Sequence, residues 1–165
     1  MQTRAIDIPH GPTLVVRPLR DGDVATVAAV FARLGDESRR RRFNAAKPCL
    51  SDAELAQLAT VDPRHHALVA HVLGDPEPAG LAQLARTGKQ CAEVAFVVAD
   101  RYHQQGIGSA LTRLLLEDAR ASGITEITAL ATGDNRAALA LIRRVASIRE
   151  VRLEGPEQSI RAAIA

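Results

Sequence analysis

The segment AEVAFVVADRYHQQGIGSALTRLLLEDARAS, residues 92–122, changes its apolar pattern halfway along. Its first part carries β-branched and aromatic residues almost without a break, which predicts a strand over residues 93–98 covered on both faces. From Ile107 onward the apolar residues recur at helical spacing, which predicts a long amphipathic helix. A turn over residues 99–105 and the pair Gly106 and Gly108 join the two elements.

This glycine pair falls where the first backbone N–H groups of the helix have no partner within the helix. The positive end of the helix dipole lies at the same place. Because a side chain at Gly106 or Gly108 would keep an anion away, we expect a cradle for phosphate or diphosphate. The segment is no P-loop, and Leu111 stands where a dinucleotide fingerprint has its third glycine. The alternative is a pair of glycines that only forms a tight turn.

Length and composition favour a single globular domain over residues 1–165, with 47% hydrophobic and 24% charged residues. The net charge of +2 argues against a large nucleic-acid interface. No apolar run reaches the length of a membrane span, and the first residues do not resemble a signal peptide. The two cysteines form no metal-like pair, so we expect a reduced, cytoplasmic protein without a metal site.

The rest of the chain alternates strand and helix patterns. Residues 36–43, DESRRRRF, predict a solvated helix face rather than a nucleic-acid patch. Together the patterns predict an α/β protein whose mixed sheet has an antiparallel half, a helical crossover and a C-terminal hairpin. The remaining predicted strands cover residues 13–18, 67–73, 79–85, 124–131, 148–153 and 159–164, and the helices cover residues 24–34, 51–59 and 133–145.

The segment VVADRYHQQGIGSAL, residues 97–111, resembles the coenzyme-A-binding motif of the GCN5-related N-acetyltransferase (GNAT) superfamily. That pattern is Arg/Gln-x-x-Gly-x-Gly/Ala after a strand. The resemblance implies the GNAT fold: a mixed sheet of six to seven strands that splays at the CoA site, with about four helices. It also implies acetyl-CoA as cosubstrate and transfer of its acetyl group to a primary amine.

The resemblance further implies which residues hold the cosubstrate. The end of the strand would line the pantetheine, and the loop after it would wrap the pyrophosphate. His103 stands where the family usually has Arg or Gln, and a neutral imidazole donates one hydrogen bond without a fixed charge. Asn135, in DNRAALALIRR (residues 134–144), would contact the cofactor, or would serve only as a helix cap. The implied set is Phe96, Val97, Val98, His103, Gln104, Gln105, Gly106, Ile107, Gly108, Ser109 and Asn135.

Glu93 is a lone carboxylate at the start of the valine-rich strand. Burial among apolar residues would raise its pKa and suit a general base that deprotonates an amine directly or through water. The alternative is a strand-end carboxylate that reaches solvent. Bacterial protein-lysine acetyltransferases carry a Glu in the matching place, so the resemblance implies a catalytic Glu93. Ile142 stands where many members have a Tyr acid, and a CoA thiolate can instead take its proton from water.

Three further segments are similar to that bacterial subgroup: VRPLRDGD (residues 16–23), LGDESRRRRF (residues 34–43) and LSDAELAQL (residues 50–58). Those enzymes acetylate lysines on acyl-CoA synthetases. The resemblance therefore implies a protein lysine, such as one on an acyl-CoA synthetase, as the acceptor. Two alternatives stay open: a small-molecule amine or antibiotic acetyltransferase, and a catalytically degenerate acyl-CoA sensor. A monomer and a homodimer are equally compatible with the sequence.

Overall fold

The computed structural model of the chain describes residues 2–164, and a single eight-stranded sheet runs through them. The strand order is β1-β2-β3-β4-β5-β6-β8-β7, and only the β5–β6 pair is parallel. The strands are β1 (Arg4–Asp7), β2 (Thr13–Pro18), β3 (His65–Val72), β4 (Pro78–Arg86), β5 (Cys91–Val98), β6 (Glu126–Thr132), β7 (Ser147–Glu154) and β8 (Glu157–Ala163).

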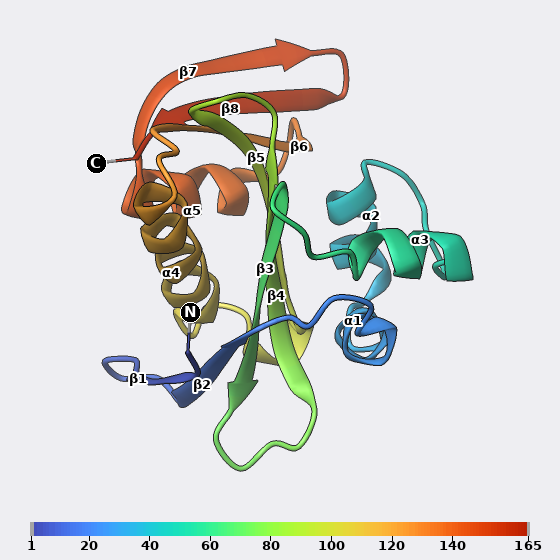
Figure 1. The fold of residues 1–165 in the computed structure, drawn as a ribbon. Helices are drawn as coiled ribbons and strands as arrows, with labels where there is room; N and C mark the ends of the chain where they lie inside the picture. Colours follow the sequence, from blue (N-terminus) through green and yellow to red (C-terminus); the bar gives the residue numbers. More distant parts are fainter. Residues whose placement is uncertain (1, 165) are drawn as a thin grey trace.

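The helices divide between the two faces of the sheet. Figure 1 shows α4 (Ile107–Ala121) and α5 (Arg136–Val145) on one face, and α1 (Val24–Ala32), α2 (Asp36–Phe43) and α3 (Asp52–Leu58) on the other. Each face has its own apolar cluster, the larger one beneath α4 and the smaller one beneath α1. A short 3-10 helix, η1 (Asp100–Tyr102), connects β5 to the loop before α4.

The sheet opens between β5 and β6. Their pairing ends at Val94 and Ala129, although β5 continues to Val98 and β6 to Thr132. The N–H of Ala99 donates to the carbonyl of Ala79 at 2.8 Å, on the β4 side. Because main-chain groups alternate along a strand, those of Phe96 and Val98 point to the β6 side. Unpaired peptide groups therefore face the opening.

The predicted order of an antiparallel half, a helical crossover and a C-terminal hairpin is confirmed. Residues 2–164 form eight strands and five α-helices, slightly more than the expected six to seven strands and about four helices. The missed strand, β1, has only the four residues RAID, with Ile6 as its one large apolar side chain, which is too short a pattern to predict a strand. The predicted ends of elements differ from the observed ones by up to three residues: α1 ends at Ala32 rather than at residue 34, and α5 begins at Arg136 rather than at residue 133.

Among residues 2–164, no helix is both long and apolar enough to cross a lipid bilayer.

Candidate active site

The loop between η1 and α4 presents a run of unpaired main-chain donors. Within the described part of the chain, none of the six N–H groups of residues 104–109 has an acceptor, whereas the N–H of Ala110 donates to the carbonyl of Gly106 at 3.0 Å. Gln104 and Gly106 have φ values of 61° and 83°, and left-handed residues of this kind let successive N–H groups converge. The positive end of α4 lies at the same place. The loop therefore fits a diphosphate.

The reason for the two glycines differs from the one expected from the sequence. A Cβ at Gly106 would lie 2.9 Å from Cγ2 of Ile8, and a Cβ at Gly108 would lie 3.0 Å from Cδ1 of Leu141. Both positions thus face the protein's own side chains rather than an anion. Glycine is required at Gly106, because its φ is positive and Ile8 of the β1–β2 turn lies close, whereas a side chain at Gly108 would only displace the tip of Leu141 on α5.

The side chains of His103 and Gln105 form hydrogen bonds with main-chain carbonyl groups next to this loop. The ring Nε2 of His103 lies 2.8 Å from the carbonyl oxygen of Val98, and a carbonyl only accepts, so Nε2 carries the proton and donates. The amide Nε2 of Gln105 donates to the carbonyl of Arg101 at 3.1 Å. In this arrangement the Nε2 atom of His103 is directed at the strand end, so only its Nδ1 atom is left for a ligand.

A hydrogen-bonded network of Tyr102, Asp75 and Arg33 fixes the position of η1, which precedes the loop. The hydroxyl of Tyr102 donates to Asp75 Oδ2 at 2.6 Å, and Arg33 Nη2 donates to the same oxygen at 2.7 Å. Arg33 also lies over the Tyr102 ring, 5.5 Å from its centroid. The Tyr102 hydroxyl, followed by the Arg33 guanidinium, holds the pKa of the Asp75 carboxyl well below its ordinary value. The network links the end of α1 to the β3–β4 loop and to η1.

This network predicts a pH-dependent stability. Because the folded-state pKa of Asp75 is lowered, its contribution is present above the unfolded pKa of about 3.9 and is lost as the pH falls below it. We expect Asp75→Asn to lower the thermal midpoint at pH 7 and to make the midpoint depend less on pH between about 5 and 3. The exposed Glu77→Gln is the matched control. Parallel midpoint curves for wild type and Asp75→Asn, measured by circular dichroism, would contradict this assignment.

The three residues expected beside the pantetheine do not all face the opening. Phe96 and Val98 turn their main-chain groups toward it, and their side chains pack on the α4 face. Val97 has its side chain in the cluster beneath α1 and is only 7% exposed. Since its main-chain groups alternate toward β4, Val97 presents neither its side chain nor its peptide groups to the opening.

Asn135 lies on the other side of the opening, at the start of α5. Its Oδ1 accepts from the N–H of Ala138 at 3.0 Å, so the cap function is present. Gln158 donates to the carbonyl of Asn135 at 3.2 Å and to that of Thr132 at 2.9 Å, which ties this turn to β8. The side-chain NH₂ of Asn135 remains available for a ligand in the opening.

Glu93 is exposed, the second of the two alternatives that its sequence position allows. It pairs with Ala85 on β4 and Thr128 on β6, one residue before the β5–β6 pairing ends. Alternation along β5 places its side chain on the face that carries α1–α3. Within residues 2–164, its carboxylate has no arginine, lysine or histidine nitrogen within 4.0 Å.

A half-buried arginine of α2, Arg42, lies near Glu93 and was not predicted from the sequence as a site residue. Arg42 Nη2 donates to Gln83 Oε1 at 3.1 Å, and Gln83 Nε2 donates to the carbonyl of Leu58 at 2.8 Å. Burial lowers the pKa of the Arg42 guanidinium, and the Glu93 carboxylate opposes this shift. All four arginines of the run are half-buried, and sequence alone does not show which of them lies near Glu93.

The other arginines of this run also have internal partners. Arg40 bonds Glu37 at 2.8 Å and Asp134 at 3.1 Å, and Arg41 bonds Glu37 at 2.7 Å. Arg39 donates to the carbonyl groups of Phe31 and Pro48. The run therefore anchors α2 across the open end of the sheet, beside the turn that carries Asn135.

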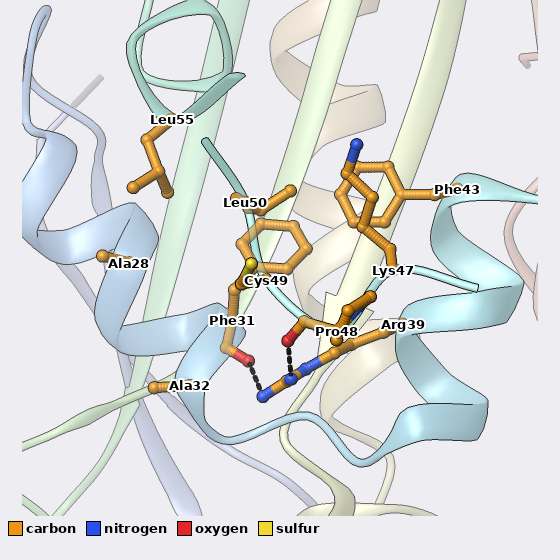
Figure 2. Close-up of a pocket in the computed structure, with 10 residues that line it drawn as sticks. All are labelled: Ala28, Phe31, Ala32, Arg39, Phe43, Lys47, Pro48, Cys49, Leu50 and Leu55. Carbon is orange, nitrogen blue, oxygen red and sulfur yellow. Dashed lines mark hydrogen bonds between the residues drawn. The ribbon is translucent and has the colours of Figure 1, made fainter. Parts of the chain in front are cut away.

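Arg39 also borders an apolar cavity between α1, α2 and α3. Figure 2 shows its guanidinium bridging the Phe31 and Pro48 carbonyls at the edge of this cavity. The rings of Phe31 and Phe43 lie 5.5 Å apart. The cavity, of about 210 Å³, is lined by Ala28, Phe31, Ala32, Arg39, Phe43, Lys47, Pro48, Cys49, Leu50 and Leu55. Glu93 does not line this cavity, nor a second cavity at the β3–β4 loop, and its side chain is exposed at the surface.

Ile142 is fully buried on α5 and has no acidic proton to give a departing thiolate. Within residues 2–164, no group of three or more His, Cys, Asp and Glu side chains is placed to hold a metal ion.

The chain is similar to known acetyltransferases in both sequence and structure. A model of the Acetyltransferase (GNAT) family matches residues 31–146. An acetyltransferase of Pseudomonas aeruginosa is 31% identical over 132 residues, which cover 77% of this chain and 70% of that protein. Acetyltransferase Pat of Mycolicibacterium smegmatis is 30% identical over 147 residues, 87% of this chain and 44% of the relative. The crystal structure of the GNAT domain of S. lividans PAT matches with a TM-score of 0.86 at 23% identity, covering 98% of this chain and 97% of that one.

Proposed function

The chain belongs to the GNAT family of acetyl-CoA-dependent acetyltransferases, and on this premise we propose that it acetylates a lysine side chain of another protein with Glu93 as the general base. The choice of a protein lysine as acceptor rests on the exposure of the Glu93 side chain. Its carboxylate is exposed and lines neither described cavity. Sites for small molecules enclose most of their ligand, whereas a lysine carried on a protein can reach an open carboxylate.

The rest of the site supports the same reaction. The six free N–H groups of residues 104–109 are suited to bind the diphosphate, which would lay the pantetheine into the opening between β5 and β6. The thioester carbonyl would then lie near the N–H groups of Phe96 and Val98, which can stabilise the oxyanion that forms during attack. Both groups lie on the same strand as Glu93, on its C-terminal side.

Glu93 has one chemical task in this proposal. A lysine arrives protonated, since its ordinary pKa is about 10.4, and only the neutral amine attacks. Glu93 takes the proton directly or through a water molecule. The nitrogen then forms a bond to the thioester carbon and loses its second proton to solvent, the C–S bond breaks, and the thiolate takes up a proton from solvent.

The proposal is tested by acceptor choice. The protein is incubated with acetyl-CoA and either a lysine-bearing protein, with an acyl-CoA synthetase as the first candidate, or a panel of polyamines, amino acids and aminoglycosides. Free thiol release gives the rate, and mass spectrometry locates the acetyl group. We expect turnover on protein lysines. Faster turnover on a small amine would overturn the choice of acceptor, and tight CoA binding without any thiol release would favour an acyl-CoA sensor.

A further inference from the structure

The β1–β2 turn packs directly on the loop that carries the free N–H groups. A Cβ placed on Gly106 would lie 2.9 Å from Cγ2 and 3.9 Å from Cδ1 of Ile8. A Cβ placed on Gly11 would lie 2.8 Å from the carbonyl oxygen of Gln105. Two glycines, one on each side, therefore allow this contact. The loop residues concerned, Gln105 and Gly106, lie in the middle of the run of unpaired donors.

The turn itself has a defined shape. The N–H of Gly11 donates to the carbonyl of Ile8 at 2.9 Å, and the N–H of Ile8 donates to the carbonyl of Pro12 at 3.4 Å. His10 between them has a φ of 59°. Ile8 is half-buried and also packs on the large apolar cluster beneath α4. Its side chain thus connects the loop to the core.

The main-chain N–H groups of the loop form no hydrogen bonds within residues 2–164 that would hold its shape, so it depends on packing by neighbouring side chains. None of its N–H groups from residue 104 to 109 bonds to the described protein, and two of its residues are in the left-handed region. A loop of this kind loses conformational freedom when it closes around an anion, and that loss weakens binding. A side chain that holds it in shape beforehand reduces the loss.

We propose that Ile8 is a positioning residue for CoA: through its Cγ2 methyl group it holds Gly106 in place, so that the loop is preorganised for the diphosphate. The inference rests on the proposed binding of CoA at this loop and adds the β1–β2 turn to the binding site. Ile8 acts through the loop and makes no contact with the reacting atoms, so its effect falls on CoA affinity and not on the chemical step.

The contact of a single methyl group allows a sharp test. Ile8→Val keeps Cγ2, whereas Ile8→Leu keeps the volume of the side chain but moves the branch away from Cβ. Ile6 is the matched control, because it is half-buried in the same hairpin and packs on the same cluster without a close approach to the loop. Calorimetric titration with CoA measures affinity for each variant, and steady-state kinetics separate KM for acetyl-CoA from kcat.

We expect Ile8→Ala and Ile8→Leu to raise Kd for CoA and KM for acetyl-CoA about five- to tenfold with kcat unchanged. Ile8→Val and Ile6→Ala should bind CoA like wild type. If Ile8→Ala bound CoA as tightly as wild type, or if Ile6→Ala weakened binding equally, the inference would be overturned while the proposed function stood. A wild-type protein that did not bind CoA would overturn both.

Discussion

Glu93→Gln is expected to lower kcat at least about tenfold and to leave Kd for CoA unchanged, because general acid–base catalysis by one side chain contributes at least this much. The substitution keeps the size and hydrogen-bonding capacity of the side chain but removes its ability to accept a proton. The carboxylate is exposed, one residue before the opening between β5 and β6. CoA affinity should persist, since the diphosphate loop lies beyond the other end of the opening.

The control for this experiment is Glu126→Gln. Glu126 lies on the neighbouring strand and pairs in register with Cys91, two residues from Glu93 on the same face. Its carboxylate lies 3.9 Å from Arg161, so it is engaged in a half-exposed ion pair. We expect its kcat to stay close to that of wild type. Equal kcat for wild type and Glu93→Gln, measured by thiol release across the pH range, would remove Glu93 from the mechanism.

Gly106→Val should weaken CoA binding at least about tenfold, because a β-branched residue is strongly disfavoured at a positive φ. Gly106 has a φ of 83°, and its Cβ would also lie 2.9 Å from Ile8. The loop must therefore change shape, which disperses its N–H groups. Calorimetric titration with CoA measures the loss.

Gly123→Val is the matched control for backbone strain. Gly123 has a φ of 86°, follows the other end of α4, and would have no atom within 4 Å of its Cβ. Both variants should lose thermal stability, but only Gly106→Val should lose CoA affinity. If both variants bound CoA like wild type, the loop would not be the diphosphate site.

The order of elements could be predicted from the sequence because each one has a clear local signal. The apolar pattern changes at Gly106 and Gly108, where strand β5 gives way to helix α4 through a loop. Ser51 and Glu54 predict a capping box, and both of its hydrogen bonds are present at the start of α3. Such signals depend on residues three or four positions apart, so they are readable in the chain itself.

The contacts that shape the site could not be predicted in the same way. Ile8 packs against Gly106, and Arg42 donates a hydrogen bond to Gln83, although each pair is far apart in the sequence. The exposure of Glu93 depends on which helices cover its face of the sheet. None of these is a local property, and the four residues of β1 are too few to predict a strand that would bring Ile8 beside the loop. The resemblance to the GNAT superfamily identified candidate site residues, whereas the contacts around those residues became visible only in the fold.

The most direct test of the account is hydrogen exchange of the backbone amides of residues 104–109 in wild-type protein, with and without CoA. All six residues carry an N–H, since no proline lies among them, and none of these groups donates to the described protein. The account predicts fast exchange without ligand and clear slowing of these amides when CoA binds. Slowed exchange elsewhere, with residues 104–109 unchanged by bound CoA, would contradict it.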